Sequence, residues 1–316
     1  GGDAIFNFRI IADLDHGAKV EGSKKPLFHS ILREGVLVRS VAGSEGGSPR
    51  YSVSWGQEHQ LYSAHNEAGR GMELSELVNY NGRIYTFDDR TGIIFEVEDA
   101  AGASPMAVPR NIVMEGDGNT DKGMKIEWAT VKDGLMYLGS MGKEYTRPDG
   151  SVANTNNLWV VTVDRDGVVT HHDYKDQYAK LRSVAGAGWP GYLIHEAIAW
   201  SEALRRWVIL PRRVSEEAYD EELDEKKGSN MVMLADEGFE QIKLFRVGQI
   251  TPERGFSSFK FLPHTNDQVI VALKSEENAA AGTEASYIMV FDLNGKVLMD
   301  ETEIPGLHKY EGIEFV

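Results

Sequence analysis

The chain has 316 residues, of which 41% are hydrophobic and 26% charged, a composition typical of a soluble globular protein with a sizeable core. Its 49 acidic and 33 basic residues give a net charge of −16, which argues against nucleic acids and anionic membranes as partners. The absence of cysteine excludes thiolate metal sites, cysteine nucleophiles and disulfides. No apolar run approaches the roughly 20 residues of a membrane-spanning helix, so we expect no membrane segment.

Short β-branched and aromatic runs between turn residues dominate the chain and predict an all-β fold. The predicted strands lie at or within 6–15, 35–42, 77–99, 134–142, 158–174, 206–211, 230–236, 256–263, 267–274 and 286–303. Asn-Gly or Asp-Gly pairs predict hairpin turns at 81–82, 133–134, 166–167 and 294–295. Only 177–186 and 215–228 have helical patterns, which argues against a parallel α/β barrel or a doubly wound sheet.

A weak internal repeat indicates the architecture. Five motifs place a lone Ser or Glu beside apolar or aromatic residues just before a hydrophobic strand, at Ser75, Glu127, Glu196, Ser257 and Glu311. Their separations of 52, 69, 61 and 54 residues exceed a WD40 blade of about 40–45 residues but fit blades with long loops. We predict one five-bladed β-propeller domain over 1–316, closed by pairing of the N-terminal strand with C-terminal strands. The alternative is an irregular pair of β-sandwiches.

The five repeat positions also suggest a metal site on the propeller axis. Ca²⁺ takes 6–8 oxygen ligands, and three glutamates with two serine hydroxyl or main-chain oxygens supply five. A set without cysteine disfavours zinc. The other interpretation is that the glutamates are merely polar residues at strand starts, and the residues alone leave both open. The segment 115–123 has the wrong spacing for an EF-hand, and we interpret it as a turn.

Motifs along nearly the whole chain resemble, in the same order, those of the soluble calcium-activated nucleotidases, or apyrases, of vertebrates and blood-feeding arthropods. They are IADLD (11–15), GRGMELSEL (69–77), YTFDDRTG (85–92), KGMKIEWATVK (122–132), GYLIHEAIAWS (191–201), RWVILPRR (206–213), GFSSFKFLP (255–263), IVALKSEE (270–277), ASYIM (285–289) and KYEGIEF (309–315). The resemblance implies a five-bladed propeller with one Ca²⁺ in its central tunnel. It also implies secretion or residence in the lumen of the secretory pathway.

Carried over residue by residue, the family's calcium ligands fall on the five repeat positions. They are Ser75, Glu127, Glu196, Ser257 and Glu311. The same resemblance implies hydrolysis of nucleoside di- and triphosphates but not of monophosphates. The repeat and the resemblance therefore select the same five residues.

Phosphoryl hydrolysis needs cations for the phosphate and a carboxylate to orient or deprotonate a water. The cationic candidates are Arg70, Arg90, Lys143, Arg212 and Arg213, of which Arg70 and Arg212 are favoured because they stand in the resembling motifs. The carboxylate candidates are Asp13, Asp15, Glu73 and Asp89, with Asp13 preferred as the base. Asp13 and Asp15 alternate along a predicted strand and should share one face.

His195 is expected to be structural rather than a general acid. Trp128, Trp200 and Tyr145 could stack on a base, but core positions are the preferred interpretation. The expected function is a Ca²⁺-dependent hydrolase of the terminal phosphate of nucleotides such as UDP, GDP and ADP, by direct water attack. The alternatives are a calcium-dependent propeller lactonase or esterase, and a binding module in which calcium only joins the blades.

Overall fold

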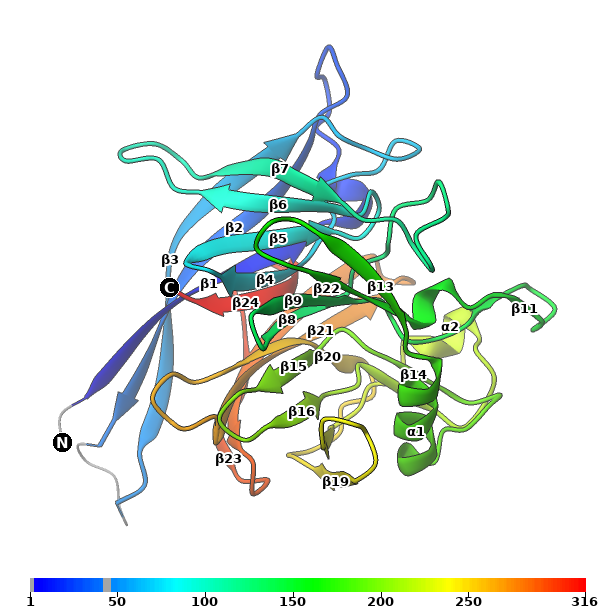
Figure 1. Ribbon diagram of the computed structural model, residues 1–316. Coiled ribbons are helices and arrows are strands. Elements are labelled where there is room, and N and C mark those ends of the chain that lie inside the picture. The colour runs from blue at the N-terminus through cyan, green and yellow to red at the C-terminus, as the bar shows by residue number, and fades with distance from the viewer. Residues whose placement is uncertain (1–2, 42–46) are drawn as a thin grey trace.

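The computed structural model describes residues 3–41 and 47–316, and within them the strands form five four-stranded antiparallel sheets. The sheets are the blades of a five-bladed β-propeller (Figure 1), as the repeat predicted. Strands are given from the tunnel outward. The first two blades comprise β24 (Lys309–Phe315), β1 (Ala4–Asp13), β2 (Phe28–Ser40) and β3 (Arg50–Ser63), then β4 (Leu74–Tyr80), β5 (Arg83–Asp88), β6 (Ile93–Glu98) and β7 (Met106–Ile112).

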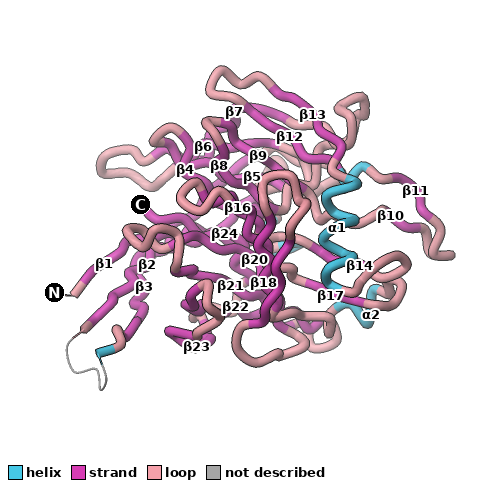
Figure 2. Tube along the Cα trace, turned by 60° about the horizontal axis from the view of Figure 1, so that its bottom comes forward, coloured by secondary structure: helices cyan, strands magenta, loops and turns pink. Residues whose placement is uncertain are grey.

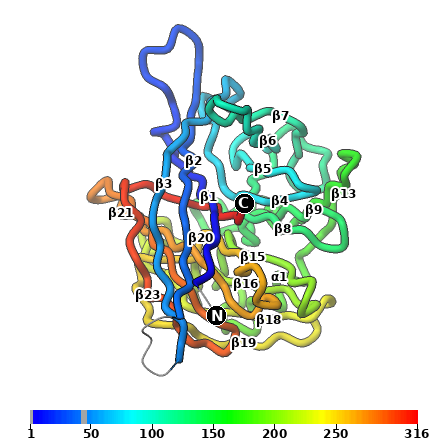
Figure 3. Tube along the Cα trace, turned by 90° about the vertical axis from the view of Figure 1, so that its left-hand side faces the viewer, coloured from blue at the N-terminus to red at the C-terminus, as the bar shows by residue number. Residues whose placement is uncertain are grey.

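The other three blades follow in chain order. They comprise β8 (Trp128–Lys132), β9 (Leu135–Gly139), β12 (Trp159–Val163) and β13 (Val169–Asp173), then β15 (Ile198–Ser201), β16 (Arg206–Ile209), β18 (Met231–Ala235) and β19 (Ile242–Arg246), then β20 (Arg254–Phe261), β21 (Val269–Asn278), β22 (Thr283–Asp292) and β23 (Val297–Glu303). Figure 3 shows β2 and β3 running together along one flank, with β24 beside β4 near the centre.

The ring is closed within the first blade, where β1 pairs with both β2 and the C-terminal strand β24. Phe8 lies opposite Phe315, and Ile10 lies opposite Ile313. Gly312 permits the close approach of β24 to its neighbours, because a Cβ there would lie 2.6 Å from a methyl of Ile11 and 2.7 Å from the backbone of β4. The predicted pairing of N- and C-terminal strands is therefore confirmed.

The hydrophobic core is divided into five clusters, and each fills the interface between two neighbouring blades. Trp128 with Trp207, for example, packs the third blade against the fourth, and Phe8 with Ile288 packs the first against the fifth. The remaining three clusters fill the other interfaces. Apolar residues thus hold the blades face to face, and this leaves polar side chains for the tunnel.

In the described part of the chain, two α-helices and two short sheets lie outside the blades, gathered on one side of the molecule (Figure 2). They are α1 (Lys175–Ala185), α2 (Glu221–Asp224), the pair β10 (Tyr145–Thr146) and β11 (Val152–Asn154), and the pair β14 (Tyr192–Ile194) and β17 (Arg213–Ser215). None of the described helices is long or apolar enough to cross a membrane. The helix predicted at 177–186 is confirmed as α1.

The helix predicted over 215–228 is wrong in extent, since only α2 forms there. Asp220 caps this single turn by accepting the backbone N–H groups of Glu222 and Leu223. No residue of α2 is buried, so no packed apolar face extends the helix in a segment with many like charges. Sequence patterns also missed β3, an outer strand whose residues are mostly polar. The strand predicted at 35–42 lies within β2 up to Ser40, and residue 42 falls outside the described residues.

The turn predictions hold to different degrees. Asn81-Gly82 and Asp133-Gly134 both have positive φ at each residue and join β4 to β5 and β8 to β9, as tight hairpin turns require. In the turns at 166–167 and 294–295 only the glycine has positive φ. The segment 115–123 is a loop, closed by a bridge between Met114 and Gly123.

The buried Glu76 on β4 should make stability depend on pH. Its Oε1 accepts hydrogen bonds from Ser258 Oγ at 2.7 Å and Lys260 Nζ at 3.2 Å, yet burial raises its pKa from 4.5 to about 7. Because the folded state keeps this proton to higher pH than the unfolded chain, the free energy of unfolding falls as pH rises between these values.

Glu76→Gln removes the titrating group and should remove that fall. We measure the free energy of unfolding in urea for the variant and for wild type at about pH 4.5 and about pH 8. The difference, variant minus wild type, should rise by on the order of 1–3 kcal/mol from the lower to the higher pH. Replacement of the exposed Glu216 by Gln serves as the control. If the free energies of unfolding of Glu76→Gln and wild type differ by the same amount at both pH values, the Glu76 carboxyl titrates normally.

Candidate functional site

A polar cavity of about 250 Å³ opens at the end of the ring where the inner strands begin. Its walls carry acidic and basic side chains from all five blades and from the segment that contains α2. The lining residues are Asp13, Asp15, Asp89, Arg90, Lys125, Glu127, Met141, Ile194, Glu196, Arg212, Arg213, Tyr219, Asp224, Glu277, Lys309 and Glu311. Few of them are apolar, so the cavity suits a charged ligand.

Three buried glutamates meet in this cavity, each from a different blade. Glu127 and Glu196 come just before β8 and β15, and Glu311 lies near the start of β24. One carboxylate oxygen of each lies within 4.8 Å of the others. Burial raises the pKa of Glu127 to about 8, and burial together with the charge of Glu196 raises that of Glu311. Such a set of hard oxygen donors fits a divalent cation such as Ca²⁺ or Mg²⁺.

Ser75 and Ser257 occupy the equivalent places on the other two inner strands, β4 and β20. Their hydroxyls donate hydrogen bonds to main-chain carbonyls: Ser75 to Phe87, at 3.2 Å, and to Ile126, and Ser257 to Tyr310 at 2.8 Å. Both side chains are buried and neither lines the cavity. The structure thus brings three of the five repeat positions together, whereas the two serines donate hydrogen bonds to the backbone near the start of the inner strand of the next blade.

Basic side chains balance the glutamates. Arg212 Nη1 donates to Glu196 Oε2 and, at 2.9 Å, to Glu311 Oε1. Lys125 Nζ lies 3.0 Å from Glu127 Oε1 and 3.3 Å from Asp89 Oδ2.

Lys309 extends this network on the side of β1. Its Nζ donates to Asp15 Oδ2 at 2.6 Å and to Glu277 Oε1 at 2.9 Å, and lies 3.6 Å from Asp13 Oδ2. The charges of Arg212 and then of Lys309 outweigh burial and lower the pKa of Glu277 to about 2. The wall beside the three glutamates is therefore a continuous set of ion pairs.

Asp13 and Asp15 both line the cavity, but not from one face of a strand as predicted. Strand β1 ends at Asp13, and Asp15 has a φ of 49° at the start of a short 3₁₀ helix, Asp15–Ala18. The reason is local, since Asp13 Oδ1 accepts the backbone N–H of Asp15 at 2.8 Å and bends the chain. Burial, above all, raises the pKa of Asp13.

Arg70 and Glu73 lie beside the cavity rather than in its wall. Arg70 donates two hydrogen bonds to the buried Glu73 and lies 3.8 Å from Asp15. It opens on a neighbouring pocket that shares Asp15 and Glu277 with the cavity. Asp89 does reach the cavity, and its Oδ1 is buried without a hydrogen-bond partner in the described part of the chain.

Of the three aromatic residues predicted to lie in the core, two do and one does not. Trp128 and Trp200 are core residues between the third and fourth blades, as expected. Tyr145 is 55% exposed, so its core assignment is wrong: the β10–β11 hairpin lies outside the five sheets, and the Lys122 ammonium lies 5.8 Å from the centroid of the ring. His195 is buried and stacks on Tyr178 with ring centroids 5.4 Å apart, and burial lowers its pKa to about 3. A neutral ring of this kind fits the expected structural role.

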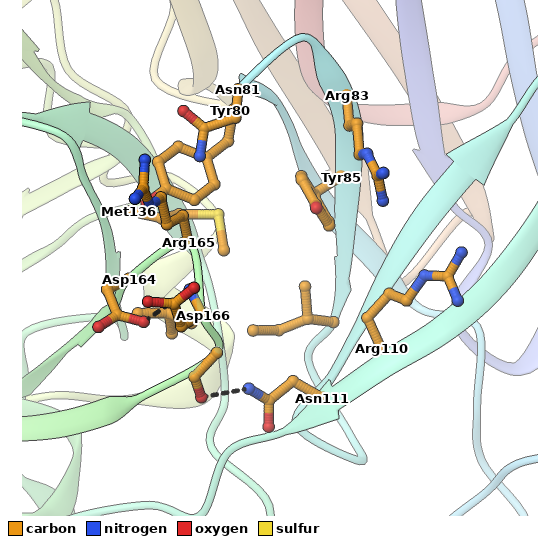
Figure 4. Close-up of a pocket in the computed structure, with 13 residues that line it drawn as sticks. Tyr80, Asn81, Arg83, Tyr85, Arg110, Asn111, Met136, Asp164, Arg165 and Asp166 are labelled. Atoms are coloured by element: carbon orange, nitrogen blue, oxygen red, sulfur yellow. Dashed lines mark hydrogen bonds between the residues drawn. The ribbon is translucent and has the colours of Figure 1, made fainter.

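A second pocket, of about 480 Å³, lies between the second and third blades (Figure 4). Its arginines are already paired: Arg83 and Arg110 lie 3.4 Å and 2.7 Å from Glu96 Oε2. Asp164 Oδ1 accepts backbone N–H groups of its own turn, at Asp166 and Val168. These charged side chains are therefore paired within their own blade or turn, whereas Asp89 Oδ1 in the tunnel cavity has no hydrogen-bond partner among the described residues.

Comparison with known proteins identifies the family. The family model described as Apyrase matches residues 14–316. The chain is 46% identical over 316 residues to mouse soluble calcium-activated nucleotidase 1, covering 100% of this chain and 75% of that protein. It is 40% identical over 313 residues to the Caenorhabditis elegans apyrase apy-1, and these residues make up 98% of this chain and 84% of the relative. The chain belongs to the apyrase family.

As an apyrase, the chain is a nucleotide phosphohydrolase, and the resemblance of its motifs is confirmed over nearly their whole range. The apyrase of Cimex lectularius is 42% identical over 275 residues, which cover 86% of this chain and 73% of that protein. A solved structure of a Synechocystis apocarotenoid oxygenase mutant aligns with 98% of this chain and 64% of its own, at 9% identity. Its TM-score of 0.33 is too low to add to the argument.

Sequence reasoning missed the two lysines of this apyrase cavity, although a signal for them exists. Lys125 and Lys309 each stand two residues before a glutamate of the triad, in the same Lys-x-Glu spacing on two different blades. Residues two apart on an extended strand face the same side. The repeated spacing therefore indicates that each lysine accompanies its glutamate into the tunnel. Glu277 lies in a resembling motif but offered no such spacing.

Proposed function

We propose that this apyrase is a Ca²⁺-dependent hydrolase of the terminal phosphate of nucleoside di- and triphosphates such as UDP, GDP and ADP, and that residues 1–316 act as a single domain. The observation that carries the proposal is the meeting of Glu127, Glu196 and Glu311 within 4.8 Å beside a wall of arginine and lysine. The carboxylates suit a hard cation, and the basic wall suits a polyphosphate. The names of the mouse and rat relatives include calcium activation.

In this proposal the three glutamates of the cavity hold the Ca²⁺. Ser75 and Ser257 do not line the cavity, and they would complete the ligand set through hydroxyl or main-chain oxygens. When bound, the ion offsets negative charge on the phosphate. Ca²⁺ is favoured over Mg²⁺ because ligands from five separate strands form a large, adaptable set rather than the small octahedron that Mg²⁺ demands. The need for the ion follows from charge, since the cavity lining contains eight acidic and five basic residues and its substrate is an anion.

The chain's own residues bind and orient the reacting groups. Arg212 lines the cavity and binds a phosphate oxygen, whereas Arg70 and Glu73 fix the segment that carries Asp15 and Asp89. Asp13 accepts the proton of the attacking water as its oxygen bonds to the terminal phosphorus. The bond from that phosphorus to the bridging oxygen breaks, and a diphosphate yields inorganic phosphate and a nucleoside monophosphate.

Phosphate release from UDP or ADP tests the proposal. We expect EGTA to abolish release, added Ca²⁺ to restore it, and Mg²⁺ in the presence of EGTA not to do so. AMP and UMP are the matched negative substrates. Full activity with Mg²⁺ and EGTA would overturn the calcium requirement. Hydrolysis of a lactone or ester without phosphate release would favour the propeller esterase, and calcium binding with neither activity would favour the binding module.

Two further parts of the proposal concern partners and location. Nucleoside di- and triphosphates are the proposed partners, and nucleic acids are not, because a net charge of −16 repels their backbones. We also propose a secreted or secretory-lumen location, where calcium is abundant enough for a weak site. Detection of the protein in the culture medium or in isolated secretory vesicles of cells that naturally make it would test the location.

A further inference from the structure

Arg212 joins three blades through their carboxylates. It follows β16, and its backbone N–H donates to Ile194 O at 2.8 Å, which fixes the start of its side chain. The guanidinium contacts Glu196 before β15, Glu311 on β24 and Glu277 on β21. The side chain is only 6% exposed, so these contacts have little competition from bulk water.

Two of these three partners belong to the triad proposed to hold the cation. The same Nη1 of Arg212 donates to both Glu196 and Glu311. A carboxylate oxygen that coordinates a cation has less charge left for a guanidinium, and the two positive groups repel each other in a buried site. Arg212 and a divalent cation therefore compete for Glu196 and Glu311.

One nitrogen of the guanidinium makes an ion pair but no hydrogen bond. Its Nη2 lies 3.3 Å from Glu277 Oε2, but it has no hydrogen bond from any described residue, and Arg212 lines the cavity. A buried donor with an ion pair but no hydrogen bond is incompletely satisfied, and a phosphate oxygen in the cavity would satisfy it with the planar geometry that arginine prefers. Arg212 can thus exchange a carboxylate for a phosphate.

The two lysines differ from Arg212 in the partners that remain when a triad glutamate binds a cation. Lys125 keeps Asp89 at 3.3 Å when Glu127 is engaged elsewhere. Lys309 has Asp15 and Glu277 at 2.6 and 2.9 Å, and its contact with Glu311 is the longest, at 3.8 Å. Among the described residues, both side-chain hydrogen bonds of Arg212 go to triad carboxylates, and Glu277 is left as an ion-pair partner at 3.3 Å.

We propose that Arg212 couples the two ligands of the site: the cation displaces it from Glu196 and Glu311, and the freed guanidinium then binds the polyphosphate. This inference rests on the proposed function and adds its regulation. Because coupling between two binding sites is reciprocal, Ca²⁺ and the nucleotide must each tighten the other by the same factor. The site then holds the polyphosphate firmly only when the cation is present.

The test measures binding rather than turnover. Calorimetry gives the Ca²⁺ affinity without nucleotide, and the affinity for a methylene-bridged diphosphate analogue with and without Ca²⁺. In wild type we expect the analogue to bind about 5- to 150-fold more tightly with Ca²⁺. In Arg212→Met we expect Ca²⁺ alone to bind at least about fivefold more tightly, because its competitor is gone, and the coupling factor to approach one.

The sign of the change in Ca²⁺ affinity separates this role from a structural one. If Arg212 only held Glu196 and Glu311 in place, Arg212→Met would bind Ca²⁺ more weakly, and that result overturns the proposal. An unchanged coupling factor overturns it as well. Arg205→Met is the matched control, since it removes one charge at the opposite end of the β15–β16 hairpin and should leave Ca²⁺ affinity as in wild type.

Two more variants complete the design. Arg212→Lys keeps the charge but loses the planar fork, so it should keep a wild-type Ca²⁺ affinity and a reduced coupling factor. Arg212→Gln replaces Arg212→Met if thermal unfolding shows that the latter does not fold. Phosphate release by wild type is measured separately. A wild-type enzyme that hydrolyses UDP but fails the sign test keeps the proposed function and loses the coupling role.

Discussion

Asp13→Asn is expected to lower kcat for UDP by about 10²–10⁴-fold at saturating Ca²⁺, with little change in KM. Asp13 lines the cavity, and its pKa is raised chiefly by burial and further by Asp89, Asp15 and Glu73. A carboxylate with a raised pKa accepts a proton from water more readily near neutral pH. Asparagine keeps the shape and can still accept the N–H of Asp15, but it cannot take the proton.

The dependence of kcat on pH is a second test, because a merely structural role of Asp13 would leave its shape unchanged. Wild-type kcat should fall on the acidic side as Asp13 is protonated, and Asp13→Asn should lose this acidic limb. Asp89→Asn is the matched variant, since Asp89 also lines the cavity and has a buried oxygen that makes no hydrogen bond with the described residues. A kcat for Asp13→Asn within about twofold of wild type, with a large loss for Asp89→Asn, would move the base to Asp89.

Glu127→Gln and Glu196→Gln should each weaken Ca²⁺ binding by at least about tenfold. Each substitution keeps the shape and one oxygen but removes a negative charge from the triad. The basic partners remain, because Lys125 keeps Asp89 and Arg212 keeps Glu311, so the positive charges now repel the ion with less compensation. Calorimetric titration with Ca²⁺ measures the loss, and the calcium dependence of phosphate release should shift in parallel.

Glu96→Gln is the control for this pair. Glu96 is also a buried, ion-paired glutamate, but its partners Arg83 and Arg110 lie at the interface of the second and third blades. It should leave Ca²⁺ affinity at the wild-type value. Circular dichroism checks that all three variants remain folded. Unchanged Ca²⁺ affinity in both triad variants would place the metal elsewhere.

The sequence by itself determined the number of blades and the positions that start the inner strands. Each blade has the same local pattern: the inner strand begins with polar residues at the tunnel and continues with apolar residues that pack between blades. The two kinds of residue are neighbours in the sequence, as in Lys309 to Phe315. Short-range patterns therefore located Glu127, Glu196 and Glu311, and the resemblance to apyrases selected the same residues.

Only the tertiary structure decided which charges meet. Arg212 lies 99 residues from Glu311 in the chain but donates to it at 2.9 Å, and no local pattern encodes that contact. Arg70, by contrast, forms its hydrogen bonds with its near neighbour Glu73 and does not line the cavity. Ion pairing depends on distance and burial after the ring has closed, since exposed and distant charges interact weakly in water. Closure of the propeller is what turns separate motifs into one site.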